Sequence, residues 1–271
     1  MSQKPFIIDD SSPIPVGPTG YIERDYSLYP EEMFAPPSEI PLIPESEWDA
    51  RIEEQEKTES SLRHIRNRAN GGTYIPSLNQ GQSPFCWAYS VGMAIMLDRA
   101  RRNLPYRRLS PHAVACKIKN FREEGGWCGL SAKFAQEVGY PDKTVWPEGS
   151  MSRNYDNDQT WENAKNYRIV EGWIDLTRPV YGQVLTFPQV VSCLLRNDPV
   201  ALDYNWWGHS VAGLRVVKIE SGSYGIEIIN SWGDSWGDNG TAIIRGNRAV
   251  PNGAIGIVRT TLSAPSSKSG E

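Results

Sequence analysis

Apolar residues follow two different patterns along the chain beyond residue 71. From residue 72 to about 166 they gather into runs that favour helices, and the longest of these is Trp87 to Leu97. From residue 167 they form short runs typical of strands, which one helix, predicted from Pro188 to Arg196, interrupts. The pattern therefore predicts an α+β fold in which a helical part precedes a strand-rich part.

Local signals mark the ends of several predicted elements. The run that begins at Cys86 ends in a group of arginines at 99–102, where cations suit the last carbonyls of a helix. Ser110-Pro111 is a typical helix start, and Ser131 is expected to cap a short helix that stops at Gly139. The predicted strands are residues 167–176, 199–204, 209–219, 224–230, 241–246 and 255–261.

The first 71 residues follow neither pattern. Residues 1–45 are rich in Pro, Ser, Glu and Tyr and predict an extended arm, while the charged stretch 44–68 allows one or two short surface helices. We expect this region to be an arm that docks on a partner, or one that blocks the functional site, rather than a part of the main domain, and we favour docking. The predicted domains are an N-terminal arm (1–71), a main domain that carries the functional site (72–262, with lobes 72–166 and 167–262) and a loose tail (263–271).

Composition narrows the class of protein. The hydrophobic fraction of 39% and the charged fraction of 22% are ordinary for a globular chain, and a net charge of −4 gives no reason to expect nucleic acid. No apolar run approaches the roughly 18 residues of a membrane span, and the N-terminus has no secretory signal. We therefore expect neither a membrane partner nor export, and a place in the cytoplasm or in a viral or bacterial assembly.

Four cysteines are few for a disulfide scaffold, and none of their spacings is that of a zinc site. We expect free thiols in a non-oxidising compartment and no metal, with a Cys116–Cys128 bridge as the alternative. Cys86 stands apart because it lies where a loop meets an apolar helix. The N-terminus of a helix favours a thiolate, the form of cysteine that attacks a carbonyl.

A thiol nucleophile needs a base, an orienting group and an oxyanion donor. Of the three histidines, His64 and His112 are predicted to be solvated, whereas His209 begins an apolar strand and is the candidate base. Asn230 ends another strand, and its amide oxygen is suited to orienting the imidazole. Gln80 lies six residues before Cys86, from where its amide N–H can reach the developing oxyanion.

Three segments carry a resemblance to a known family. Residues 79–90 (NQGQSPFCWAYS) are similar to the nucleophile motif of papain-like cysteine proteases. Residues 208–213 (GHSVAG) resemble the family's histidine motif, and residues 230–240 (NSWGDSWGDNG) resemble its asparagine motif. The three occur in the family's order, and the resemblance extends from about residue 72 to 260.

The resemblance implies a two-lobe fold, with a helical lobe, a β-barrel-like lobe and the active site in the cleft between them. It implies that Cys86 is the nucleophile, His209 the general base and acid, and Asn230 the orienting group. Gln80 would complete the oxyanion hole, and Trp232 would shield the contact between His209 and Asn230. No cofactor is implied. The expected substrate-binding residues are Cys128, Gly129, Gly208 and Trp232.

The sequence also departs from the family. Ser83 stands where the family usually has a disulfide-forming cysteine, and Cys128-Gly129 stands where we place its substrate-binding glycine pair. Residues 129–147 resemble divergent bacterial and viral members more than lysosomal or plant enzymes. The usual inhibitory propeptide has no clear match.

The resulting hypothesis is a peptidase that hydrolyses peptide or isopeptide bonds of a protein or peptide substrate through a thioester. Two alternatives remain open at this stage. One is a cell-wall amidase or transpeptidase with the same Cys–His dyad, since fold does not determine substrate. The other is a structural or binding component of a larger assembly that retains the protease fold.

Overall fold

The computed structural model describes residues 5–24, 41–72, 74–177, 186–220 and 222–261. Its helices are α1 (Glu45–Lys57), α2 (Leu62–Gly72), α3 (Cys86–Arg101), α4 (Pro111–Ile118), α5 (Cys128–Glu137), α6 (Asp158–Ala164) and α7 (Thr186–Leu195). Its strands are β1 (Ile7–Ile8), β2 (Trp173–Asp175), β3 (Val200–Tyr204), β4 (His209–Glu220), β5 (Ser223–Ile229), β6 (Thr241–Ile244) and β7 (Gly253–Ile257). In the parts of the chain described here, no helix is long and apolar enough to cross a membrane.

The strands form one sheet in the order β1-β6-β5-β4-β3-β7-β2. All neighbouring pairs are antiparallel except β1 and β6, which are parallel. The described strands at the two ends of this order, β1 and β2, do not pair with each other, so the sheet is open rather than closed like a barrel. The prediction of an α+β two-lobe fold is confirmed, with this correction to the shape of the second lobe.

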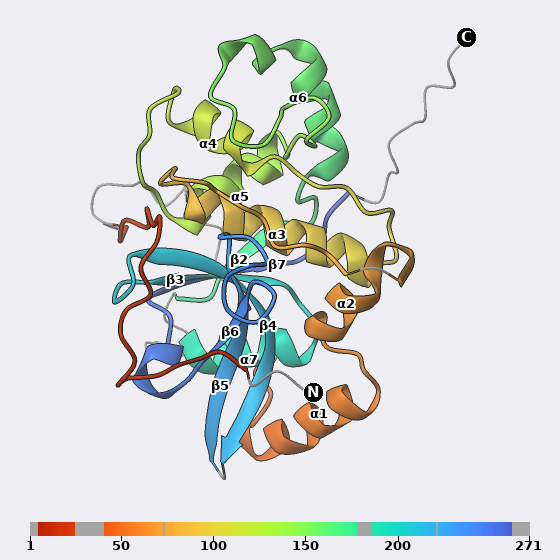
Figure 1. The fold of residues 1–271 in the computed structure, drawn as a ribbon. Helices are drawn as coiled ribbons and strands as arrows, with labels where there is room; N and C mark the ends of the chain where they lie inside the picture. The colour runs from red at the N-terminus through yellow and green to blue at the C-terminus, as the bar shows by residue number, and fades with distance from the viewer. Residues whose placement is uncertain (1–4, 25–40, 73, 178–185, 221, 262–271) are drawn as a thin grey trace.

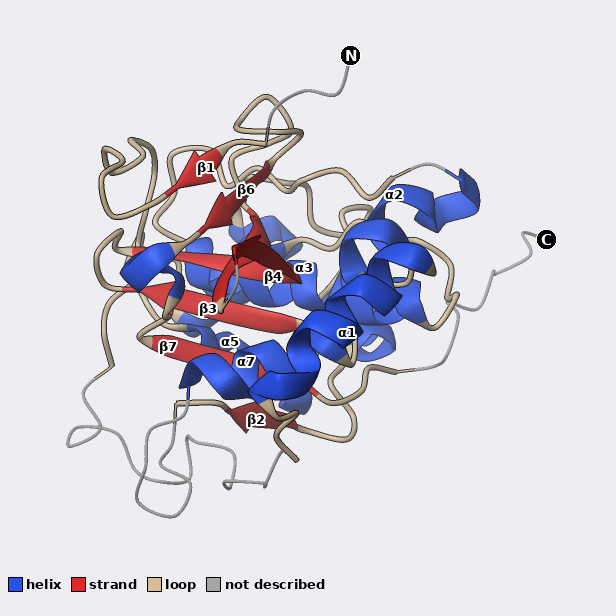
Figure 2. Cartoon of the chain, turned by 90° about the horizontal axis from the view of Figure 1, so that it is seen from below, coloured by secondary structure: helices blue, strands red, loops and turns tan. Residues whose placement is uncertain are grey.

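Helix α3 lies between the two lobes (Figure 1) and packs against β3 and β4. It is buried almost throughout, from Cys86 to Arg99, which explains why its sequence is a continuous apolar run rather than an amphipathic pattern. Helices α1 and α7 cover the other face of the sheet (Figure 2). The sheet is thus covered on both faces, and α3 presents its first residue at the junction of the lobes.

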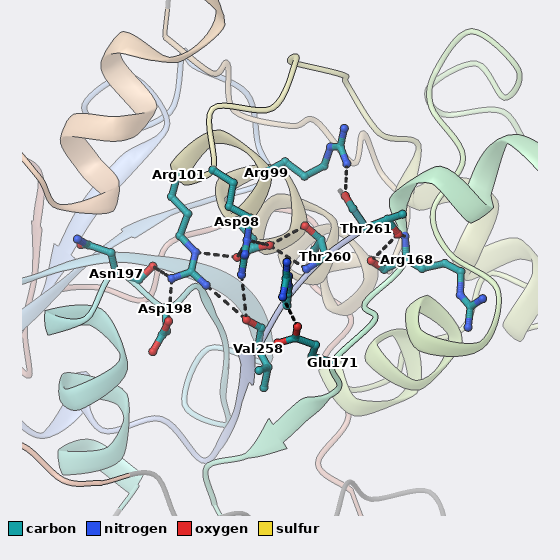
Figure 3. A network of polar contacts seen from close by, with 12 residues as sticks. Asp98, Arg99, Arg101, Arg168, Glu171, Asn197, Asp198, Val258, Thr260 and Thr261 are labelled. Atoms are coloured by element: carbon teal, nitrogen blue, oxygen red, sulfur yellow. Dashed lines mark hydrogen bonds and ion pairs between the residues drawn. The ribbon is translucent and has the colours of Figure 1, made fainter. Parts of the chain in front are cut away.

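The C-terminal end of α3 is fastened to the chain segment after β7 (Figure 3). The buried carboxylate of Asp98 accepts hydrogen bonds from Arg101 on its own helix, from Arg102 directly after the helix, and from the backbone and hydroxyl of Thr260. The two arginines also reach the carbonyl of Val258. The arginines thus lie at the C-terminus of α3, as the sequence predicted, and two of them also join the two lobes.

Within the predicted N-terminal arm, the charged stretch 44–68 was expected to allow one or two short surface helices, and it forms α1 and most of α2. Helix α1 buries Trp48 and Ile52, and the Trp48 ring packs edge-on against Tyr224 of β5 at 5.1 Å. Helix α2 buries Leu62 and Arg66. Each helix thus packs a few buried residues against the rest of the protein, while its many charges remain at the surface.

Two other local predictions are corrected. Helix α5 begins at Cys128 rather than at Ser131, because the Ser131 hydroxyl donates to the carbonyl of Trp87 on α3 at 2.9 Å instead of capping. His112 is not solvated: it is 3% exposed, and its Nδ1 lies 2.8 Å from the hydroxyl of Tyr89. Both side chains are used in contacts across the helical lobe, which no local pattern reveals.

Candidate active site

Cys86 is the first residue of α3 and is completely buried. Burial raises the pKa of its thiol to about 12, although the backbone N–H and the hydroxyl of Ser210 favour the thiolate. Ser210 directly follows His209 on β4, so the strand brings the histidine and the thiol to the same place. The remaining three cysteines are also free and buried, at positions 116, 128 and 193.

His209 and Asn230 are in direct polar contact with each other. The His209 Nε2 lies 2.7 Å from the Asn230 Oδ1, and both residues come from the ends of adjacent strands, β4 and β5. An amide oxygen only accepts, so this contact places the proton of a neutral ring on Nε2. The Nδ1 atom is buried without a hydrogen-bond partner and is left as a proton acceptor.

Two tryptophans enclose the His209 ring. The ring centre of Trp232 lies 4.8 Å from it and that of Trp207 lies 4.7 Å from it. Burial in this cage lowers the pKa of His209 to about 4, against the hydrogen bond to Asn230, which raises it. A shielding role was predicted for Trp232 but not for Trp207, although Trp206-Trp207 directly precedes the histidine motif.

Gln80 lies in the loop before α3 and is 1% exposed. Its Oε1 accepts from the Ser231 hydroxyl at 2.6 Å, next to Asn230, and its Nε2 donates to the carbonyl of Ser83 at 2.7 Å. These contacts fix the amide group in the loop directly before α3. Ser83 thus takes part in ordering this loop in the place of the family's cysteine, since its hydroxyl also donates to the Gln80 carbonyl.

Residues 15–22 lie over this site and contact its side chains mainly through their backbone carbonyls. Trp207 Nε1 donates to the carbonyl of Pro15 at 3.2 Å, and Trp232 Nε1 donates to that of Pro18 at 2.8 Å. The Gln80 Nε2 lies 3.5 Å from the carbonyl of Thr19, the outer limit of a hydrogen bond. In Figure 1 this N-terminal segment, drawn in red, runs beside both the sheet and the helical lobe.

The same segment joins the two lobes by backbone pairing. The backbone N–H groups of Gly20 and Tyr21 donate to the Gly208 carbonyl at 3.1 and 3.0 Å. On the helical lobe, the Gly126 N–H donates to the Gly20 carbonyl at 3.0 Å, and its carbonyl accepts from Ile22 at 2.9 Å. The pairing is parallel, and it leaves the Cys86 and His209 side chains without solvent exposure.

This pairing does not involve Cys128 and Gly129, for which substrate binding stays a prediction. These two residues are buried in the first turn of α5, and the Cys128 thiol donates to Asp203 at 3.0 Å. The residues whose backbone faces the N-terminal segment are Gly125 and Gly126. A Cβ at Gly126 would lie 2.8 Å from the Trp87 ring, so the chain passes close over α3 only with glycine there. The doublet Gly125-Gly126 is visible in the sequence but was not among the predicted site residues.

The remaining predicted residues lie together. Three separate sequence segments meet where α3 begins beside β4 and β5, and they bring together Cys86, His209, Asn230, Gln80 and Trp232, with Gly208 beside them. The fold and this set of side chains resemble those of papain-like thiol hydrolases.

Comparison with known proteins agrees with this class. The chain is 26% identical to mouse cathepsin K over 227 residues, which are 78% of this chain and 64% of that protein. It is 22% identical to the cathepsin B-like CP1 of Giardia intestinalis over 195 residues, 63% of this chain and 64% of that protein. The chain thus spans less than two thirds of the length of either relative. No family model matches the sequence.

Solved structures show the same fold. Xylellain, a cysteine protease from Xylella fastidiosa, superposes with a TM-score of 0.61 at 16% identity, covering 91% of this chain and 96% of that one. Procathepsin L 3 from Tenebrio molitor larval midgut superposes with a TM-score of 0.55 at 15% identity, covering 80% of this chain and 90% of that one. The chain thus has the fold of papain-like cysteine proteases and resembles cathepsins in sequence.

Proposed function

We propose that the protein is a cysteine peptidase in which Cys86 attacks the carbonyl carbon of a peptide bond in a protein or peptide substrate. The observation that carries this proposal is the His209–Asn230 contact. This contact fixes the ring so that Nδ1 is left as an acceptor with no partner among the described residues. Ser210, the next residue on β4, hydrogen-bonds the Cys86 sulfur.

The reaction follows from these positions. His209 Nδ1 takes the thiol proton as the sulfur bonds to the substrate carbonyl, and the negative charge moves to the carbonyl oxygen. The Gln80 amide and the backbone at the start of α3 stabilise that oxyanion. His209 then gives its proton to the leaving amine, and water hydrolyses the resulting thioester. Asn230 keeps the ring in orientation through both proton transfers.

The conformation described here is a closed one, and we propose that residues 15–24 keep the enzyme latent. They cover both catalytic side chains, and burial keeps the thiol and the imidazole neutral, which disfavours the reactive ion pair. Arg24 anchors the end of this segment to the buried carboxylate of Asp175 on β2 at 2.7 Å. These contacts favour self-inhibition over our earlier expectation of docking on a partner.

The test uses an epoxysuccinyl thiol probe and a fluorogenic peptide on the full chain and on a variant lacking residues 1–24. We expect the shortened protein to be labelled at Cys86 and to hydrolyse the peptide, and Cys86→Ala to abolish both. Labelling without hydrolysis of peptide or casein, but with cleavage of muropeptides, would replace the peptidase with a cell-wall amidase. Absence of labelling in the folded, shortened protein would contradict a thiol mechanism.

A further inference from the structure

A cavity lies at the C-terminal end of α3, opposite the end that carries Cys86. It has a volume of about 520 Å³ and is bounded by α2, α3 and the loop that follows α3. Arg99 lies thirteen positions after Cys86 on the same helix, a distance of about 20 Å along the helix axis at 1.5 Å per residue. This cavity is therefore separate from the site described above.

The cavity is positively charged and partly apolar. Three arginines line it, Arg68, Arg99 and Arg107, and no aspartate or glutamate is among its described lining residues. Its walls include the apolar side chains of Ile75, Met96 and Leu104. Arg107 is exposed and forms no ion pair with a carboxylate in the described chain, so its charge is available to the cavity.

Arg99 is the least expected of the three, because it is only 2% exposed. Its Nη1 donates to the carbonyls of Thr261 at 2.9 Å and Asn166 at 3.4 Å, and its guanidinium lies 4.8 Å from the Tyr167 ring centre. Its Nε and Nη2 atoms are buried and have no hydrogen-bond partner among the residues that the structure describes. Two donors of a buried cation are thus left unused.

The neighbouring carboxylate does not satisfy these donors. Asp98 precedes Arg99 on α3, but Figure 3 shows its oxygens directed to Arg101 and Thr260 while the Arg99 guanidinium reaches away toward Thr261. A buried donor left unsatisfied is destabilising, and more so when it is charged. An anion with two oxygens matches the fork of a guanidinium and would remove this cost.

We propose that this cavity binds a small organic anion, with a phosphate or carboxylate group held by Arg99 and Arg107 and an apolar body against Ile75, Met96 and Leu104. The α3 C-terminus itself repels an anion through its carbonyls. Two or three guanidinium groups outweigh the half charge of a helix end. The proposal does not depend on peptidase activity and applies equally to the Cys86→Ala protein.

The test is calorimetric titration of full-length Cys86→Ala protein with phenyl phosphate, benzoate, inorganic phosphate and phenol. We expect saturable binding of phenyl phosphate or benzoate, and the tighter of the two identifies the anionic group. Arg107→Ala should weaken that binding at least tenfold, and so should Arg99→Lys, which keeps the charge but loses the fork. Arg51→Ala on α1 removes an equally positive, exposed side chain elsewhere and should leave binding unchanged.

Three results would overturn the proposal. These are no saturable binding of either aromatic anion, binding of phenol as tight as that of the anions, or equal weakening by Arg107→Ala and Arg51→Ala. Arg107 is exposed, so its substitution tests the site even if Arg99→Lys lowers the melting temperature.

Discussion

Replacing Gly20 with alanine should release the N-terminal segment from the active site. Gly20 has a φ of +141°, a conformation that L side chains rarely adopt, and an added Cβ would overlap the backbone carbonyl of Pro84 in the loop before Cys86. Neither conflict is relieved by rotating a side chain. The closed conformation must therefore distort or open.

The size of the effect follows from the backbone strain at Gly20 and from the overlap with Pro84. Backbone strain of this kind costs about 1–3 kcal/mol, and the overlap with Pro84 adds to it. A total of roughly 2–4 kcal/mol shifts the equilibrium between closed and open forms by about 30- to 1,000-fold. If the closed form dominates in the wild-type protein, Gly20→Ala should raise the activity by this factor, up to the point at which the open form is the major species.

Two assays follow the opening independently. Peptide hydrolysis reports a working enzyme, while the rate at which Cys86 is alkylated reports exposure of the thiol without needing a substrate. Gly149→Ala is the matched control, because Gly149 has a φ of +73° but no atom within 4 Å of an added Cβ. We expect Gly20→Ala to accelerate both assays and Gly149→Ala to change neither.

The reasoning is refuted if Gly20→Ala leaves both rates at the wild-type level although limited proteolysis shows that the segment has been released. Faster alkylation without faster hydrolysis would instead preserve the blocking role and contradict the proposed peptidase activity. Loss of a complex in sizing experiments, with unchanged activity, would restore the docking interpretation.

Three further predictions concern the site and its surroundings. Gln80→Ala in the opened enzyme should lower kcat by roughly 10²–10³-fold while Cys86 alkylation stays unchanged, and equal slowing of both would remove Gln80 from the oxyanion hole. Asn230→Ala removes the partner of His209 Nε2, so about 1–3 kcal/mol, or 5- to 150-fold in kcat/KM, should be lost; an unchanged value would contradict its orienting role. Burial lowers the pKa of both His112 and His209 to about 4, so the unfolded state binds more protons between about pH 6.5 and 4. Stability should therefore fall as pH falls through that window, by up to about 3 kcal/mol per histidine. Urea unfolding at pH 7 and 4.5 measures this loss, which His112→Gln should reduce, and an equal loss in both proteins would exclude His112.

Much of the catalytic part could be predicted from the sequence because its signals are local. The apolar run after Cys86 matches α3, and the short apolar runs match β3, β4, β5 and β6 within a few residues. The candidate side chains stand at the start of a helix or at the ends of strands, and such positions can be read from the pattern alone. The tertiary structure then brings these candidate side chains close to one another.

Other features depended on contacts between segments distant in the sequence. Residues 15–22 bind through backbone carbonyls, which any sequence possesses, so nothing in their side chains indicates a path over Trp207 and Trp232. Gly126 matters because Trp87 lies beneath it, and Arg99 is notable only because the surrounding chain buries it. The sequence alone determined which groups carry the chemistry, whereas tertiary packing decided which of them are covered, because burial and backbone pairing arise only when distant segments meet.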